Sequence, residues 1–544
     1  MRSLPLVLLL FGAAFLFPSL GTLPLIDWDE NIYAEASRQM VLRGDYLNVF
    51  INDYPFAEKP PFFFWMQALS YHLWGVSEFA ARFPSAVSGM LMILWCYAVG
   101  RRLSGPRLGM LWAVMYLTAL MPSILARSAV IDHTFNLWIS VATFLLYAYD
   151  RILQQQSPLK VLPSPWVPLL GASVAMGVAV MTKGPLGGVI PLVAFASYKL
   201  FSGNPRVPWL HFLVCGAVSL TIASSWYLMN WVIYGTEFIQ GFIQFQLNLF
   251  TRPLESHSGP WFYHLGVAVL GLLPWTAFLL QNPRLLWNSG RPHDRALLRM
   301  SLGWFVFVLV LFSVVQTKLP HYSASFYVPL TLVAAMLTDR SLEQRRRFPT
   351  SVGWGVLVLM GGLAVLSFYV LPQEGNRFLQ ERVPDLGLSW DPQVQTFGIG
   401  FATGVLIAAL LLLRRQVLQG VAVLAVSMLL WTQALWLFHM PQVLGFVQTP
   451  MLTLLEEAHR QNQRVVFYRY VSFAALFYGD QPIEMLHTDK FPGNPEVLDL
   501  PQEVDLAVIT QLKHEESLLR DHPRVRLVRR LGDFVRYEIP RGTP

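Results

Sequence analysis

Charged residues are scarce in this sequence. Asp, Glu, Lys and Arg make up only 13% of the 544 residues, whereas hydrophobic residues make up 54%. A soluble globular domain carries about 25% charged residues. The deficit lies mainly in the first 440 residues, where long apolar runs alternate with short polar loops. This composition excludes an ordinary soluble globule and predicts a polytopic membrane protein.

Several chemical signatures are also missing. The sequence has no HExxH motif, no CxxC pair and no Walker-type glycine loop, so metalloprotease chemistry and nucleotide hydrolysis lack support. The only cysteines, Cys96 and Cys215, lie inside apolar runs and are most simply small hydrophobic residues. The formal charge of +7 comes from basic residues in short loops, so it indicates membrane orientation rather than nucleic-acid binding.

Thirteen apolar runs are long enough to cross a bilayer, which takes roughly 17 to 25 residues. They cover about 4–22, 84–101, 107–124, 133–149, 166–182, 185–201, 209–229, 261–281, 301–316, 321–338, 352–372, 394–413 and 418–438. A cleaved signal peptide is the alternative for the first run, although no clean small-x-small cleavage site follows it.

Basic residues fall in alternate loops between these runs. The loops of that side hold Arg2, Arg101, Arg102, Arg107, Arg151, Lys160, Lys199, Arg206, Arg284, Arg291, Arg295, Arg299, Arg340, Arg345, Arg346, Arg347, Arg414 and Arg415. The positive-inside rule makes this side cytoplasmic. The long loops 23–83, 230–260 and 373–393 then face outward, and the C-terminus lies outside the membrane.

The outer loop 23–83 contains two expected helices. Residues 29–43 combine apolar residues near helical spacing with early acids and a late Arg43, which suits an amphipathic helix on the membrane that ends at Gly44. Residues 59–75 begin with two prolines and carry an aromatic band typical of the membrane interface.

The composition changes after about residue 440. "RVVFYRY", "VDLAVIT" and "VRLVRRLGDFVRYEI" are strand-like, while "TPMLTLLEEAHRQ" and "KHEESLLRDH" look helical. The pattern predicts a mostly α transmembrane domain over 1–439, with the juxtamembrane helices of loop 23–83, and a small soluble extracytoplasmic α/β domain over 440–544.

Acids at the outer membrane face are candidates for function, because burying a carboxylate there is unfavourable. Asp29 and Glu30 begin the first outer helix, and Asp132 begins the fourth span in "RSAVIDHTFNLW". The alternative is helix capping by Asp27, Asp29 or Asp132, or pairing of Asp132 with the nearby Arg127. If the acids converge on one cleft, one of them can act as a general base.

Three lysines interrupt short outer turns against the positive-inside trend. Lys59 follows Glu58 in "YPFAEKPPFFFW", Lys183 lies in "MTKGPLGG", and Lys318 lies near Tyr322 in "TKLPHYSASFY". Binding of a lipid-linked phosphate explains all three. Snorkelling of Lys59 and plain turn composition for the others are the alternatives. The lone His257 is a metal ligand or, more simply, an exposed loop histidine.

Several of these segments together resemble one family. "DENIYAEASRQMVLRGDY", "NDYPFAEKPPFFFW", "IDHTFNLW", "TKGPLG", "HSGPWFY" and "TKLPHY", in this order, resemble the GT-C fold membrane glycosyltransferases of the lipid A aminoarabinose transferase and protein O-mannosyltransferase-like branch. The motifs span most of residues 20–330, and D-E-x-x-Y-A together with E-K-P-P is the most specific part. The thirteen spans and the outer C-terminal domain also match the aminoarabinose transferases.

The resemblance implies a role for each matching residue. Asp29 is the expected catalytic base, and Asp132 is the second acid. The remaining expected roles are a divalent ion, zinc by expectation, on Glu58 and His257, and donor-phosphate contacts from Lys59, with Lys183, Lys318 and Tyr322 near the cleft. Aminoarabinose transferases usually carry arginine where this chain has Ile32, whereas Asp29, Glu30 and Tyr33 are retained.

The expected activity is inverting transfer of a sugar from a polyprenyl-phosphate donor at the outer face of the inner membrane. The acceptor is a membrane lipid such as lipid A, a glycan or a protein hydroxyl, and neither a nucleotide nor a nucleic acid takes part. A transporter or lipid flippase is the alternative, but transporters concentrate polar residues near the bilayer midplane. A non-catalytic scaffold leaves Asp29, Asp132 and the outer lysines unexplained.

Overall fold

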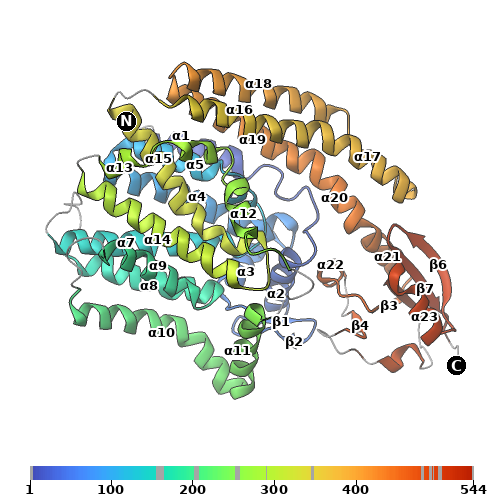
Figure 1. Cartoon of the computed structure of the whole chain (residues 1–544). Coiled ribbons are helices and arrows are strands. Elements are labelled where there is room, and N and C mark those ends of the chain that lie inside the picture. Colours follow the sequence, from blue (N-terminus) through green and yellow to red (C-terminus); the bar gives the residue numbers. More distant parts are fainter. Residues whose placement is uncertain are drawn as a thin grey trace.

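The helices of the first 440 residues lie side by side in one bundle, and a small sheet lies at one end of it (Figure 1). This computed structural model describes residues 4–154, 164–200, 207–251, 258–288, 291–344, 348–479, 483–488, 493, 495–499 and 505–541. Helices predominate among these residues, as the sequence predicts.

Each of the thirteen predicted spans coincides with a helix or with two consecutive helices. These are α1 (Leu4–Leu16), α4 (Glu78–Ser104), α5 (Pro106–Leu117) with α6 (Leu120–Leu125), α7 (Asp132–Leu153), α8 (Trp166–Lys183), α9 (Leu186–Leu200), α10 (Trp209–Tyr234), α12 (Tyr263–Gly271) with η2 (Trp275–Leu280), α14 (Pro292–Val314), α15 (Tyr327–Glu343), α16 (Thr350–Val365) with η4 (Leu366–Val370), α18 (Gln393–Leu413), and α19 (Val417–Ala434) with η6 (Leu435–His439). Shorter elements between them are α11 (Thr236–Thr251), α13 (Arg284–Trp287), η3 (Pro320–Phe326), α17 (Leu371–Arg382) and η5 (Pro384–Leu386).

Seven helical segments within the described part of the chain are long and apolar enough to cross a membrane. They are Glu78–Ser104, Trp166–Lys183, Trp209–Tyr234, His293–Val314, Thr350–Glu381, Gln393–Leu413 and Val417–Val447. The other six predicted spans are shorter, broken in two or more polar. Helix α7, for example, begins with Asp132 and includes Asp150. The protein is therefore a multi-pass membrane protein, and the full count of thirteen crossings stays a prediction.

Loop 23–83 folds into helix α2 (Asp29–Arg43), the short strands β1 (Phe50–Ile51) and β2 (Tyr54–Pro55), and helix α3 (Phe62–Trp74). Gly44, with φ of 66°, ends α2 and donates its N–H to the carbonyl of Val41. The predicted apolar face is buried, but so are Asn31 and Glu35. Helix α2 is thus enclosed on more sides than a helix lying on a membrane surface, because Gln67 of α3 and the carbonyl of Leu476, near the C-terminus, both hydrogen-bond to it.

The C-terminal unit contains a five-stranded sheet in the order β4-β3-β5-β7-β6. Strands β4 and β5 pair parallel to β3, whereas β7 pairs antiparallel to both β5 and β6. The elements are α20 (Met440–Val447), α21 (Thr449–Arg460), β3 (Arg464–Tyr468), α22 (Phe473–Tyr478), β4 (Glu484–Leu486), η7 (Pro495–Leu498), β5 (Leu506–Gln511), η8 (Leu512–His514), α23 (Glu515–Asp521), β6 (Arg526–Leu531) and β7 (Phe534–Ile539).

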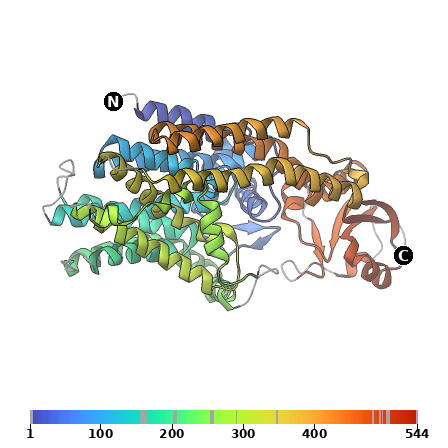
Figure 2. The same cartoon turned by 45° about the horizontal axis from the view of Figure 1, so that its top comes forward.

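The predicted domain boundary at residues 439 and 440 lies inside a continuous helical stretch, since α19, η6 and α20 follow one another without a break. The sheet itself begins only at Arg464. Figures 1 and 2 show this unit at the end of the bundle that carries α2. Division into two domains at residue 440 stays a prediction.

The two ends of the bundle differ in charge as the sequence predicts. Helices α4 and α15 each end with basic residues, and α14 begins with them. At the opposite ends of α7 and α8 lie Asp132 and Lys183, the candidate site residues. The fold therefore places Asp132 and Lys183 at the bundle end beside α2, which begins with Asp29.

Candidate active site

Asp29 and Asp132 are the first residues of helices α2 and α7. Neither helix has a hydrogen bond from a side chain that caps its N-terminus, so both carboxylates are available for other partners. The capping alternative therefore does not hold for these two acids. Arg127 does not pair with Asp132 either, because it donates to the carbonyls of Phe15 and Pro18.

His321 contacts Asp29. Its Nε2 atom lies 3.2 Å from Oδ2 of Asp29, and only 28% of the Asp29 side chain is exposed. Burial raises the pKa of Asp29, but the hydrogen bond and charge of His321, with the charges of Lys59 and Lys183, outweigh burial. The net pKa of Asp29 lies below its ordinary value, so this carboxylate stays ionised and able to accept a hydrogen bond.

Asp132 pairs with Lys183, which is the last residue of α8. Gly184, with φ of 96°, ends that helix and places the lysine at the end of the bundle. The Lys183 ammonium also lies 4.9 Å from the ring centroid of Tyr322. An aromatic face stabilises a nearby ammonium, so Tyr322 helps to hold Lys183 in place. The structure thus brings together three of the predicted residues, Asp132, Lys183 and Tyr322.

Lys59 is buried, and its ammonium lies 4.8 Å from the ring centroid of Phe245 in α11. Burial lowers the pKa of Lys59, and the charge of Lys183 lowers it further, whereas Glu58, Asp29 and Asp132 raise it. The net pKa lies below that of an ordinary lysine. The charges of both acids therefore act on Lys59, and its predicted contact with a donor phosphate stays a prediction.

Tyr33 lies one helical turn after Asp29 and is buried against the rings of Phe63 and Phe64. Burial raises the pKa of Tyr33 well above its ordinary value, and the negative charges of Asp29 and Asp132 raise it further. The phenol therefore remains a neutral hydrogen-bond donor beside the two acids. Tyr33 belongs to the site on this geometry.

Glu30 lies at the start of α2, as the sequence predicts, but its contacts are with the protein itself. Its carboxylate is buried and accepts hydrogen bonds from Arg82 at 2.8 and 2.9 Å, from the Ile26 N–H at 2.8 Å and from the Ala129 N–H at 2.6 Å. These bonds occupy both oxygens, so Glu30 has no free acceptor for a substrate. Instead, it ties the start of α2 to the segment before α7, which fixes Asp29 relative to Asp132.

Lys318 also departs from its predicted role. Its ammonium donates to the carbonyls of Phe312, Ser313 and Val315 at 2.8, 2.7 and 2.5 Å. Those carbonyls lie at the end of α14, where the helix leaves them without intrahelical partners. Since an ammonium has three donors, all are used, and Lys318 stabilises a helix end rather than presenting a charge to phosphate.

The metal prediction rests on Glu58 and His257. His257 lies outside the described residues, so the structure places only Glu58. The charge of Glu58 acts on Lys59 and on Tyr33, which puts its carboxylate near the cluster. Among the described parts of the chain, no group of three His, Cys, Asp or Glu side chains is arranged to hold a metal ion. The described residues alone therefore do not complete a metal site.

Two further residues at the site were missed by the sequence reasoning. His321 lies within the "TKLPHY" motif that supplied Lys318 and Tyr322, and a histidine beside two other motif residues is the signal that points to it. Asp27 accepts hydrogen bonds from Ser472 and from the Ala474 N–H in the C-terminal unit. No local sequence pattern predicts that contact, because 445 residues separate Asp27 from Ser472.

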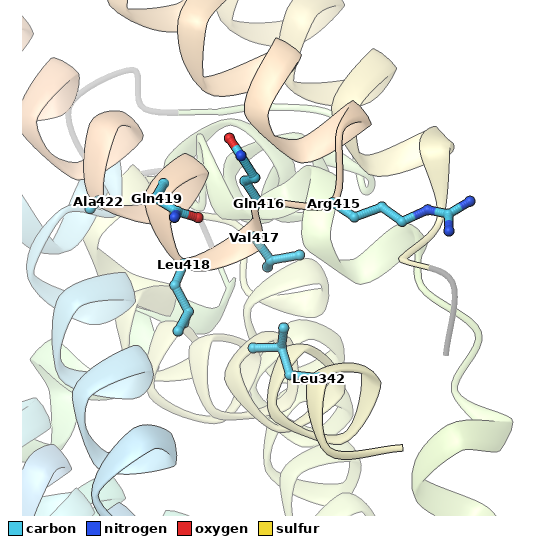
Figure 3. A pocket seen from close by; sticks show the side chains of 7 residues that line it. All are labelled: Leu342, Arg415, Gln416, Val417, Leu418, Gln419 and Ala422. Carbon is cyan, nitrogen blue, oxygen red and sulfur yellow. The ribbon is translucent and has the colours of Figure 1, made fainter. Parts of the chain in front are cut away.

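A surface hollow of about 510 Å³ lies away from this cluster (Figure 3). It occupies the turn between α18 and α19 and the end of α15, at the bundle end that carries the basic residues. Its lining consists of Leu342, Arg415, Gln416, Val417, Leu418, Gln419 and Ala422. None of the predicted site residues takes part in it.

Comparison with known proteins agrees with this fold. The family model of dolichyl-phosphate-mannose-protein mannosyltransferases matches residues 58–228. The undecaprenyl phosphate-α-4-amino-4-deoxy-L-arabinose arabinosyl transferase 2 of Pseudomonas fluorescens strain Pf0-1 is 29% identical over 371 residues, which are 67% of this chain and 64% of the relative. The corresponding enzyme of Pseudomonas aeruginosa strain UCBPP-PA14 is 30% identical over 388 residues, 70% of this chain and 66% of the relative.

Solved structures show the same architecture. ArnT from Cupriavidus metallidurans superposes with a TM-score of 0.78 in its complex with undecaprenyl phosphate and 0.79 in the apo state, at 23% and 22% identity, with 99% of each chain covered. At this identity the likeness shows the fold. The fold defines a GT-C membrane protein.

The chain belongs to the GT-C glycosyltransferase family of the lipid A aminoarabinose transferase and protein O-mannosyltransferase-like branch. The matched region covers 64% of the length of each of the first two curated relatives, just under two thirds.

Proposed function

We propose that this protein transfers a sugar from a polyprenyl-phosphate donor to a lipid acceptor, with inversion at the anomeric carbon. One observation carries the proposal: Asp132 pairs with Lys183 at one end of the bundle, and the charges of Lys59 and Lys183 act on the Asp29 carboxylate. A leaving phosphate needs neutralisation of its negative charge, and an acceptor needs a base or a hydrogen-bond acceptor to orient it. This cluster supplies both.

The reaction forms a bond between the acceptor oxygen and the anomeric carbon while the bond from that carbon to the phosphate oxygen breaks. The bonding electrons leave with the polyprenyl phosphate, and Lys59 and Lys183 stabilise the charge it gains. Asp29 accepts the proton of an acceptor hydroxyl, or hydrogen-bonds to an acceptor phosphate monoester and orients it. Its low pKa suits orientation and a late proton transfer, since a strong base is not needed against a good leaving group.

The donor in this proposal carries undecaprenyl phosphate and a pentose of the aminoarabinose type. The names of the curated relatives support that choice, and the structural relative was solved with undecaprenyl phosphate bound. The charge bias of the helix ends supports an extracytoplasmic site, because the basic residues of α4, α14 and α15 gather at the other end. A lipid A-like acceptor fits a site at this membrane face.

The transporter alternative is less well supported by the same geometry. A transporter concentrates its polar groups in broken helices near the bilayer midplane. Here Asp132 begins α7 and Lys183 ends α8, so this buried ion pair lies at helix ends. An ion pair at the membrane surface suits a reaction between two lipid headgroups.

The test compares lipid extracts and envelope glycans of cells with and without the gene by mass spectrometry, and then repeats transfer with purified protein and an undecaprenyl-phosphate sugar. Wild-type protein should add one sugar mass to a membrane lipid, whereas Asp29→Asn should abolish transfer yet still bind undecaprenyl phosphate. Asp53→Asn is the matched control, because Asp53 is an exposed acid of the same loop that pairs with Arg43. Identical extracts and no transfer by purified wild-type protein would overturn the proposal.

A further inference from the structure

The segment that precedes Asp29 is held by the C-terminal unit. The Oδ1 atom of Asp27 accepts a hydrogen bond from the Ala474 N–H at 2.8 Å, and Oδ2 accepts one from the Ser472 hydroxyl at 2.8 Å. The Asp27 N–H in turn donates to Oε1 of Gln448 at 2.7 Å. Asp27 is therefore bonded on both its backbone and its side chain to residues more than 420 positions away.

Trp28 connects this anchor to Asp29 in an unusual backbone conformation. Its φ is 87° and its ψ is −116°, a region that residues with a side chain rarely adopt. The ring of Trp28 packs edge-on against Phe473, with 5.2 Å between the ring centroids. A conformation of this kind persists only where the surroundings enforce it. The C-terminal unit supplies such contacts, to the Asp27 carboxylate and to the Trp28 ring.

Further contacts extend the attachment along the same segment. The Leu25 N–H donates to the Tyr478 hydroxyl at 2.8 Å, and the Leu25 carbonyl accepts from Gln448 at 2.9 Å. Later in α2, Arg38 donates to the carbonyl of Leu476 at 2.9 Å. Helix α2 thus rests against α22 both before its first turn and along its length, so a displacement of the C-terminal unit moves the start of α2.

We propose that the C-terminal unit positions the catalytic carboxylate, and that Asp27 is the positioning residue. Asp27 and Ser472 fix the chain on one side of Trp28, and Asp29 follows directly on the other. The inference rests on the proposed function of Asp29. It gives a role to the C-terminal unit, although Asp29, Asp132, Lys59 and Lys183 all lie outside that unit.

The kinetic test uses full-length protein. Asp27→Ala should lower kcat about 10- to 100-fold through misplacement of the reacting groups, while KM for the donor changes less than about twofold. It should also move the acid limb of the pH profile upward, because a displaced Asp29 loses its hydrogen bond from His321. Asp27→Asn should restore most activity, since its amide can accept from Ala474 and donate to Ser472. Ser472→Ala is a milder variant that removes one bond to Asp27.

Thr510→Val is the matched control. It removes a buried hydrogen bond of the C-terminal sheet, from Thr510 to the Tyr468 carbonyl, without touching residues 25–28. It should leave kcat and the pH profile unchanged. Equal losses in Asp27→Ala and Thr510→Val would show a general stability effect and would overturn the positioning role, as would wild-type kinetics in Asp27→Ala.

A second measurement needs no turnover. Spin labels at Leu42 of α2 and Leu519 of α23, both exposed, report the distance between α2 and the C-terminal unit, and the two native cysteines are buried. The distance distribution should be narrow in wild-type protein and broader in Asp27→Ala. An unchanged distribution would overturn the positioning role. Absence of sugar transfer by wild-type protein would overturn the proposed function separately, so the two failures are distinguishable.

Discussion

The imidazole of His321 lies 3.2 Å from the carboxylate of Asp29 and joins η3 to the first residue of α2. The two residues are separated by almost three hundred positions, yet the hydrogen bond from His321 is the main opponent of burial in setting the pKa of Asp29. This contact gives the proposed base a defined orientation and keeps it ionised. It also makes the pH dependence of transfer sensitive to a residue outside the acid pair.

Replacement of His321 should therefore move the acid limb of the kcat/KM profile. Asp29 acts as a carboxylate, so activity falls as pH drops through its pKa. In His321→Phe the hydrogen bond and charge are gone and burial still raises the pKa, so the acid limb should shift to higher pH. His321→Gln keeps a donor and should shift it less. An unchanged acid limb in His321→Phe would contradict control of Asp29 by His321.

The pKa of Lys59 should set the alkaline limb of the pH profile for donor binding. Burial and the charge of Lys183 lower the pKa of Lys59, so its ammonium loses its proton at lower pH than an ordinary lysine. Affinity for undecaprenyl phosphate should therefore decline on the alkaline side, and Lys59→Arg should retain affinity there. Lys59→Ala should weaken donor binding about 10- to 100-fold at neutral pH, the range for a charged hydrogen bond. Titrations with undecaprenyl phosphate at several pH values measure all three proteins, and a larger effect on acceptor binding would contradict the assignment.

Much of this site follows from local sequence signals. Turn residues and apolar periodicity predict the helix starts at Asp29 and Asp132 and the helix end at Lys183. The charge of the loops separately predicts that these three residues lie on the same side of the membrane. The strands of the C-terminal unit also follow from short alternating or apolar runs, except β4, whose three residues are too few to show a pattern.

The rest depends on contacts between distant segments. Nothing near Glu30 shows that Arg82 and the Ala129 N–H will occupy its carboxylate, or that the Lys318 ammonium will fold back on its own helix end. Both residues carry the charge that a site needs, and sequence reasoning cannot distinguish a charge that binds a ligand from one that is already satisfied. The same limit hides Asp27, whose partners come from the last hundred residues.

Glu30→Gln should lower the stability of the folded protein and not only the rate of sugar transfer. The Arg82 guanidinium is fully buried and also donates to the carbonyls of Leu20, Leu23 and Pro24. Loss of the Glu30 charge leaves that cation without its counterion, which costs about 3–5 kcal/mol when a buried pair is broken. Thermal unfolding in detergent measures the change. Glu381→Gln, in the exposed pair with Arg377, should have little effect, and equal midpoints for the two variants would contradict a structural role for Glu30.

The expected metal site can be tested by elemental analysis of the purified protein. We propose from the family resemblance that Glu58 and His257 bind a divalent ion, for which zinc is the first candidate. Purified active protein should contain about one equivalent by elemental analysis, and Glu58→Gln and His257→Ala should each reduce it. Asp53→Asn, an acid of the same loop, should not. Fully active protein with no divalent ion would exclude the site.

Lys183 and Lys318 should respond differently to the same substitution. Lys183 faces Asp132 and Tyr322, so Lys183→Met removes a positive charge from the cluster and should lower both donor affinity and transfer by at least about tenfold. The ammonium of Lys318 is bound by three carbonyls, so Lys318→Met should leave those carbonyls unsatisfied and lower the unfolding temperature, while donor affinity in the folded protein stays near wild type. Donor titrations and thermal unfolding separate the two effects. Loss of a residue that contacts the phosphate weakens donor binding, whereas loss of a residue that stabilises a helix end lowers the unfolding temperature. If Lys318→Met lowered donor affinity as much as Lys183→Met without loss of stability, Lys318 would be assigned to the phosphate site. Its contacts at the end of α14 would then describe only the protein without donor.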